Sequence, residues 1–142
     1  MLRGEGPRLF TVEEANRLLP DITEQLHHLR MIQDRLWKAE KDKAVEELSW
    51  LREDGTVSPS AQRNIELLEQ RLERAGKEFE VALEQFAESG AQLKDLQSGL
   101  VDFFTARDDS LVFLCWKEGE DRIRFWHEIE TGFAGCRALK EF

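Results

Sequence analysis

The chain has 142 residues, enough for one ordinary domain with a sizeable hydrophobic core. It carries 20 lysines and arginines against 29 acidic residues, a formal net charge of −9, which disfavours nucleic acid and anionic membranes as partners. No apolar run approaches the roughly 18 residues of a membrane span, and MLRGEGPRLF lacks the apolar core of a signal peptide. We therefore expect an acidic cytoplasmic protein.

The first predicted element is a short helix over residues 12–18. In the stretch TVEE, Thr11 can cap the amide of Glu14 while the Glu14 side chain returns to the Thr11 amide. Pro20 lacks an amide donor and disfavours helical geometry in the residue before it, so we expect a kink or a restart there. A long helix follows over about 20–52. Apolar residues recur through this region at helical spacing: Leu18, Ile22, Leu26, Leu29, Ile32, Leu36, Ala44, Leu48 and Leu51.

A second long helix is predicted over residues 59–89. Gly55 ends the preceding element, Ser58 followed by Pro59 supplies a cap and a first helical residue, and Gly90 ends the helix. Its apolar residues alternate in steps of three and four, which is typical of a coiled-coil seam: Ile65, Leu68, Leu72, Ala75, Phe79, Ala82 and Phe86. The short connection predicts an antiparallel helical hairpin within residues 1–90.

Several large apolar residues lie outside this seam. They are Met31, Trp37, Trp50, Leu67 and Val81. Two helices alone leave such side chains uncovered, and a second copy of the chain could cover them. We therefore expect a homodimer or a higher oligomer built on the hairpins.

Residues 91–142 predict a small antiparallel sheet packed at the base of the hairpin, so that the chain forms one structural unit of the α+β class. The runs QLKDL, LVDFFTA, SLVFLCWK and RIRFWHE are rich in β-formers, and turn residues separate them. Asp108 and Asp109 mark one reversal and residues 118–121 mark another, so SLVFLCWK and RIRFWHE should pair as a hairpin.

Two polar residues interrupt these apolar strands. In a strand, His127 shares a face with Ile123 and Phe125, whereas Glu128 points to the other face. A buried imidazole needs partners for its two nitrogens, either as a structural brace or as a metal ligand or acid–base group. Asp102 lies within LVDFF, where an ionised carboxylate needs a salt-bridge partner or a functional role.

The candidate polar site comprises Asp95, Asp102, Glu120, His127, Glu128 and Arg137. One imidazole and several carboxylates can bind a divalent ion or divide acid and base roles, and His127, Asp102 and Asp95 are the candidate metal ligands. In GFAG, Gly132 and Gly135 allow backbone amides to approach a ligand, although glycines also simply make turns.

The two cysteines, Cys115 and Cys136, form no CxxC pair, and we expect them to be thiols. Within LVFLCW, Cys115 is typical of a small buried apolar side chain. The chain also lacks GxxxxGK, GxGxxG, HExxH and GxSxG, the usual sequence signatures of nucleotide binding, zinc peptidases and serine hydrolases.

Several stretches together resemble a known family. FTVEEANRLLP, LKDLQSGLVDFF, LCWKEGED and IRFWHEIETGFAG closely resemble the bacterial family known as domain of unknown function 2203, which brings no established activity. The positions that match its distinctive residues are Asp95, Gly99, Asp102, Trp116, Gly119, Glu120, Trp126, His127, Gly132, Phe133 and Gly135.

The chain departs from that family's pattern in two places. Similar proteins typically read GLVDFP, whereas Phe104 stands here in place of the proline and allows the strand to continue. They commonly have an arginine directly after GFAG, where this chain has Cys136 and then Arg137. A shift of one residue in a strand turns the guanidinium to the opposite face.

Two functional hypotheses remain open on these observations. The first is an oligomeric protein-interaction or assembly module built on the helical hairpin. The second is a small-molecule or metal-dependent enzyme with an Asp/Glu/His site on the sheet. The sequence does not decide whether the chain is an enzyme, and the only cofactor it points to is a divalent metal ion.

Overall fold

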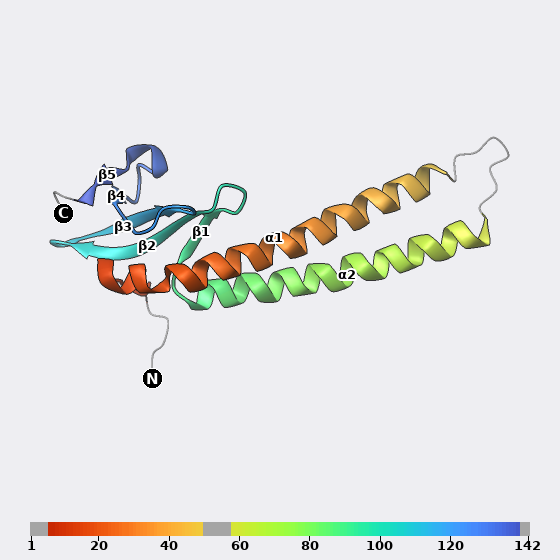
Figure 1. The fold of residues 1–142 in the computed structure, drawn as a ribbon, viewed down its shortest axis with the longest axis horizontal. Helices are drawn as coiled ribbons and strands as arrows, with labels where there is room; N and C mark the ends of the chain where they lie inside the picture. Colours follow the sequence, from red (N-terminus) through yellow and green to blue (C-terminus); the bar gives the residue numbers. More distant parts are fainter. Residues whose placement is uncertain (1–5, 50–57, 140–142) are drawn as a thin grey trace. The chain divides into compact units, whose positions relative to one another are not determined.

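The computed structural model describes residues 6–49 and 58–139. Two long helices pack together and are followed by a five-stranded antiparallel sheet with strand order β1-β2-β3-β4-β5 (Figure 1). The elements are α1 (Val12–Leu48), α2 (Pro59–Glu88), β1 (Gln92–Asp95), β2 (Leu100–Arg107), β3 (Ser110–Lys117), β4 (Phe125–Glu128), the 3-10 turn η1 (Phe133–Gly135) and β5 (Arg137–Ala138). The predicted α+β class, with a helical hairpin before an antiparallel sheet, is confirmed.

The chain divides into two compact units. The sheet unit lies within residues 1–27 and 84–142, so it includes the first turns of α1 and the end of α2 as well as the sheet. The hairpin unit lies within residues 28–83 and consists of the remainder of both helices. That the two act as one structural unit stays a prediction. No helix in the described part of the chain is long and apolar enough to cross a membrane.

Helix α1 begins as expected but does not stop at Pro20. The Thr11 hydroxyl accepts a hydrogen bond from the Glu14 amide at 3.1 Å, and the Glu14 carboxylate accepts one from the Thr11 amide at 2.9 Å. The helix then continues through Pro20 to Leu48, so the predicted separate helix over residues 12–18 is wrong.

Burial of one helix face explains why α1 tolerates the proline. A proline inside a helix costs about 3 kcal/mol through its missing donor and its steric clash. Leu19, Ile22 and Leu26 are all buried on the same stretch. Each buried leucine or isoleucine contributes roughly 1.5–3 kcal/mol, so their combined contribution exceeds the cost of the proline.

The hairpin unit largely follows the predicted apolar pattern. The predicted seam of α2 is buried at Ile65, Leu68, Ala75 and Ala82, while Leu72 and Phe79 are half-buried. Between the helices, Arg35 donates to Glu78 at 2.7 Å. On α1 the pattern fails near the end of the helix, where Ala44 and Leu48 are exposed. The predictions that involve Trp50, Leu51, Gly55 and the helix end at 52 lie outside the described residues.

Both ends of α2 match the sequence signals. The Ser58 hydroxyl accepts a hydrogen bond from the Ala61 amide at 3.1 Å, and the helix begins at Pro59. After the helix ends at Glu88, Gly90 adopts a φ of 92°. A side chain at Gly90 would meet Arg8 and Phe10, because a Cβ there would lie 2.8 Å from the Arg8 Cδ. Glycine is therefore required at this helix end.

Short turns set the register of the sheet. Strands β2 and β3 reverse at Asp108–Asp109, as predicted, and Asp108 adopts a φ of 54°, which aspartate tolerates better than most residues. This register places Asp102 opposite Cys115. Strand β3 pairs with β4, which confirms the predicted hairpin, and β2 continues through Phe104, as expected from the absence of a proline there.

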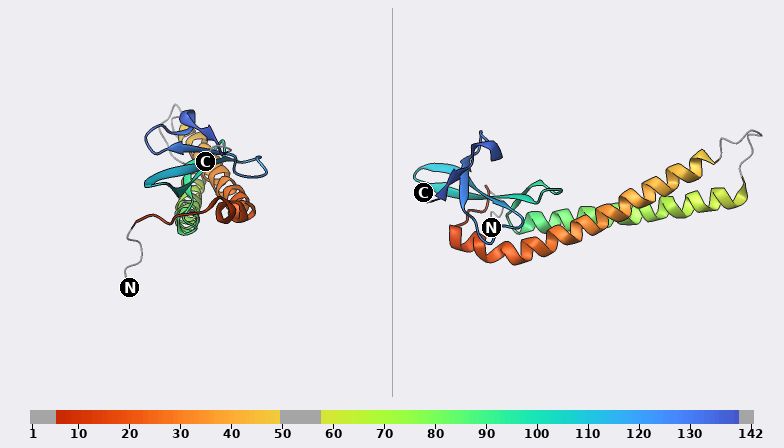
Figure 2. Two further views of the ribbon diagram at one scale, coloured as in Figure 1. Left: turned by 90° about the vertical axis from the view of Figure 1, so that its left-hand side faces the viewer. Right: turned by 45° about the horizontal axis from the view of Figure 1, so that its top comes forward.

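The two faces of the sheet have different surroundings. One face carries a buried apolar layer: Val101, Phe103, Leu114, Trp116 and Trp126. Phe10 packs edge-on against Phe103, and Asn16 at the start of α1 accepts a hydrogen bond from the Ile123 amide at 2.8 Å. Figures 1 and 2 show the first turns of α1 on one side of the sheet and the segment containing η1 on the other. The side chains of Asp102, Cys115 and His127 lie on the face away from the apolar layer.

Removing the hydroxyl of Thr11 tests the start of α1. We expect Thr11→Ala to lower the free energy of unfolding by about 1 kcal/mol, because the Glu14 amide loses its capping acceptor. Thr11→Ser keeps an oxygen in the same place and should leave most of the stability intact. Chemical denaturation followed by circular dichroism measures both changes, and an equal loss in the two variants would contradict the capping role.

Candidate metal centre

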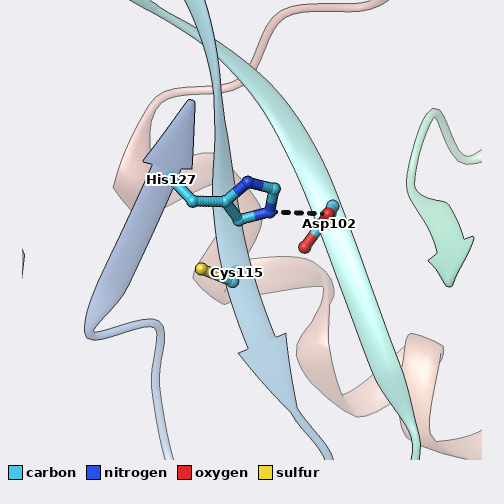
Figure 3. A group of neighbouring side chains, drawn as sticks. All are labelled: Asp102, Cys115 and His127. Carbon is cyan, nitrogen blue, oxygen red and sulfur yellow. Dashed lines mark hydrogen bonds and ion pairs between the residues drawn. The ribbon is translucent and has the colours of Figure 1, made fainter. Parts of the chain in front are cut away.

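His127 on β4 is the centre of a buried polar cluster. Its Nε2 lies 2.9 Å from Asp102 Oδ2 on β2, and its Nδ1 lies 2.7 Å from the backbone carbonyl oxygen of Glu128. Figure 3 shows the imidazole extending from β4 across β3 to the carboxylate. His127 is 1 % exposed and Asp102 is 5 % exposed, so the contact between them is closed to bulk water.

These two contacts determine how many protons the pair can hold. A carbonyl oxygen only accepts hydrogen bonds, so Nδ1 of His127 must carry a proton. The 2.9 Å contact between Nε2 and Asp102 then needs one further proton, held either by the imidazole or by the carboxylic acid. The pair is electrically neutral in both arrangements. A neutral pair is what burial favours, since an isolated buried charge is costly.

The electrostatics of Asp102 agree with a retained proton. Burial raises the pKa of Asp102, and this effect outweighs the hydrogen bond and charge of His127 and the charge of Lys94, which lower it. Lys94 Nζ lies 4.7 Å from the centre of the Phe113 ring, and that ring is 5.3 Å from the His127 ring. The Phe113 ring thus lies between the Lys94 ammonium and the His127 imidazole.

Two thiols adjoin this pair. Cys115 on β3 is 1 % exposed, and its Sγ lies 2.6 Å from the Sγ of Cys136, which is half-buried. Both cysteines are free thiols. Burial raises the pKa of Cys115, as do the contact with Cys136 and the nearby Asp102 carboxyl, and burial likewise raises the pKa of Cys136.

Three of these side chains together form a metal-type donor set. A carboxylate oxygen of Asp102, the sulfur of Cys115 and a ring nitrogen of His127 all lie within 4.8 Å of one another. Imidazole, thiolate and carboxylate are the ligands that zinc takes in proteins, usually four at a time. Cys136 lies next to Cys115 and supplies the nearest further sulfur.

A tight turn brings Cys136 to this cluster. The Gly135 amide donates to the Gly132 carbonyl at 3.0 Å, and the Thr131 hydroxyl donates to the Glu128 carbonyl at 3.1 Å. A Cβ at Gly135 would collide with the side chain of Thr131, so glycine is required there. Gly132 adopts a φ of 64°, which glycine also favours. The GFAG stretch thereby folds into the turn that precedes Cys136.

The side chains of the other predicted site residues make different contacts from the His127 ring. Asp95 ends β1 and accepts hydrogen bonds from the amide and hydroxyl of Ser98. Glu120 accepts a hydrogen bond from the Lys117 amide at 2.9 Å, which closes the turn after β3. The Glu128 carboxylate is 3.7 Å from the guanidinium of Arg137, and both of these side chains are exposed. Of the six predicted polar residues, Asp102 and His127 thus form the buried pair, while Glu128 and Arg137 form an exposed one.

Sequence reasoning missed both thiols as members of this site. Cys115 is buried, as predicted, but its sulfur also borders the polar pair. The predicted turn at Asp108–Asp109 could have identified Cys115. Pairing the residues of the two strands outward from that turn places Cys115 opposite Asp102. Cys136 lies outside that hairpin, so its position could not be found by counting from the turn. It depends instead on the turn after β4.

The enclosure of the cluster limits its chemistry. Asp102 and His127 are almost fully buried. An organic substrate could therefore reach them only if the surrounding chain moved. A single ion is small enough to replace a proton between these donors. The geometry therefore favours metal binding or a structural brace over a conventional substrate pocket.

Comparison with known proteins adds the family but no activity. A search of curated proteins finds no match, and a search of solved structures finds none either. The profile of a family described as "Uncharacterized conserved protein (DUF2203)" matches residues 8–139, which include every residue of the cluster. The chain therefore belongs to the DUF2203 family, as the resemblance of its motifs indicated.

Proposed function

We propose that the sheet unit binds one divalent transition-metal ion, with zinc as the best fit. The observation that carries this proposal is the convergence of Asp102, Cys115 and His127 from three neighbouring strands within 4.8 Å. All three are buried, so their donor atoms face one another and not solvent. A hard oxygen, an imidazole nitrogen and a sulfur together suit zinc better than calcium or magnesium, which prefer oxygen ligands alone.

Charge balance supports the same proposal. Zinc with one carboxylate, one thiolate and one neutral imidazole carries no net charge, so the ion compensates the two anions that it creates by displacing protons. A thiolate from Cys136 as the fourth ligand would leave a single negative charge. It would also give the closed four-coordinate set of a structural site, which ties strands β2, β3 and β4 to the turn before β5.

Changing Asp102 separates metal binding from a structural brace. In Asp102→Asn the amide can donate to Nε2 of a neutral His127, so the hydrogen bond survives while the anionic ligand is lost. We expect this variant to fold and to bind zinc at least tenfold more weakly than the parent, as outer-shell changes alone cause losses of about 10–100-fold. Competition titration with a chromogenic zinc chelator measures the affinities.

His127→Ala removes a ligand and is the complementary variant. It should lose zinc binding and should also lose roughly 3–5 kcal/mol of stability, because Asp102 is left buried without its partner. His28→Ala is the matched control, since His28 is an exposed histidine on α1. Zinc affinity that stays unchanged in Asp102→Asn and His127→Ala would leave the cluster as a structural brace.

The raised pKa values determine how zinc binding should depend on pH. Burial raises the pKa of Asp102 and that of Cys115. The Cys115 thiol therefore keeps its proton at neutral pH, and the contact between Asp102 and His127 holds a second proton. Zinc must displace them, and protons compete most strongly at low pH. The affinity should therefore rise with pH, by up to about tenfold per pH unit for each proton released. Calorimetry in buffers of different ionisation enthalpy counts those protons, and a flat pH profile would argue against thiolate ligation.

A second candidate function is self-assembly through the hairpin unit. The large apolar residues that the sequence placed outside the seam are exposed where the structure describes them: Met31, Trp37, Leu67 and Val81. Val45, which is 59 % exposed, and Leu67, which is 54 % exposed, line one hollow between α1 and α2. Exposed apolar side chains that share a hollow are typical of an interaction surface.

Charge complementarity favours a second copy of this chain as the occupant. The α1 side of the hollow carries Asp42 and Glu46, whereas the α2 side carries Arg71. A two-fold axis brings the α1 side of one copy to the α2 side of its partner, so the acidic pair meets the arginine twice. Such a two-fold contact would pair the hollow of one copy with the same hollow of its partner.

Charged substitutions in the hollow test this assembly. We expect the parent chain to form a dimer at high micromolar concentration and Val45→Lys/Leu67→Lys to be monomeric, because two lysines would have to be buried at the contact. Leu111→Lys, at an exposed leucine on β3, is the control and should stay dimeric. Light scattering gives the masses, and a monomeric parent would remove this candidate.

A further inference from the structure

The two thiols have a chemistry of their own, apart from any metal. The Sγ atoms of Cys115 and Cys136 are 2.6 Å apart, and the chain contains only these 2 cysteines. Cys115 belongs to β3, whereas β4 separates β3 from β5 in the sheet. Cys136 must therefore extend over β4 to reach it, and the turn that contains η1 provides that path.

We propose that Cys115 and Cys136 form a reversible oxidation site, which closes to an intramolecular disulfide by exchange with a small-molecule disulfide such as glutathione disulfide. The two residues differ in access, because Cys136 is half-buried and Cys115 is 1 % exposed. That difference assigns their roles. Cys136 meets the oxidant first, and Cys115 resolves the intermediate from inside the sheet unit.

The exchange balances in two steps. The Cys136 sulfur loses its proton and attacks glutathione disulfide, which expels one glutathione thiolate and leaves a mixed disulfide on Cys136. The Cys115 sulfur then loses its proton and attacks the Cys136 sulfur, which expels the second glutathione thiolate. The protein loses two hydrogen atoms and is oxidised, and one glutathione disulfide is reduced to two glutathione molecules.

The disulfide would also control the proposed metal site. A sulfur bonded to sulfur is no longer a thiolate, so oxidation removes Cys115 as a ligand along with Cys136. Asp102 and His127 alone would then hold the ion weakly, and bound zinc would in turn protect both thiols from oxidation. This consequence rests on the proposed metal function, whereas formation of the disulfide does not.

Oxidation of metal-free protein tests the proposal directly. We expect incubation with glutathione disulfide to lower the titratable thiols of each folded chain from 2 to none. Intact-mass analysis should show the loss of two hydrogen atoms without a glutathione adduct, and dithiothreitol should restore both thiols. Two thiols that persist in the folded parent, or a disulfide found only between chains, would overturn it.

Single variants test the order of attack. Cys115→Ser should accumulate a mixed disulfide on Cys136, because the resolving sulfur is gone. Cys136→Ser should keep its buried thiol unmodified, and circular dichroism checks that each variant remains folded. Glutathione on Cys115 in folded Cys136→Ser would contradict the assigned roles.

Zinc distinguishes failure of the metal function from failure of the disulfide. Equal oxidation rates with and without zinc would count against the metal site while leaving the disulfide standing. Slower oxidation in zinc, at least tenfold if zinc occupies the site at saturation, supports both.

Discussion

The contact between His127 and Asp102 constrains everything around it. Two ionisable groups are buried together, and the Glu128 carbonyl requires a proton on the far nitrogen of the imidazole. The remaining proton can move between nitrogen and oxygen but cannot leave without creating a net charge in a closed site. Loss of that proton would leave a buried negative charge, which the metal ion that we propose would compensate.

The sheet makes this contact possible because its two faces carry different side chains. One face forms an apolar layer with the first turns of α1, where the buried residues outweigh the cost of Pro20. The other face is thereby available for polar side chains, which adjacent strands bring into line. Gly135 allows the last turn to close over that face and carry Cys136 with it. Packing on one side thus leaves the other side to the buried polar cluster.

The thiol pair depends on how the chain orients two neighbouring residues. Cys136 directly follows GFAG, and its Sγ lies 2.6 Å from that of Cys115, whereas the guanidinium of Arg137 lies 5.2 Å from the Trp126 ring. Cys136 and Arg137 point in opposite directions because neighbouring residues of a strand alternate between the two sides of a sheet. The position after GFAG faces the buried cluster, and a sulfur there can serve either a metal or a disulfide.

The amino-acid sequence by itself determined the α+β class, the caps at Thr11 and Ser58, the helix end at Gly90 and the reversal at Asp108–Asp109. Each of these depends on residues close together in the chain, where hydrogen bonds and backbone preferences are local. It also marked Asp102 and His127 as polar residues in apolar strands. Tertiary structure decided that α1 continues through Pro20, because the burial that opposes the break involves distant segments. It likewise decided that Cys115 and Cys136 adjoin Asp102 and His127, whereas Asp95 and Glu120 hydrogen-bond within turns. Strand register and the turn after β4 determine which side chains meet, and spacing along the chain does not.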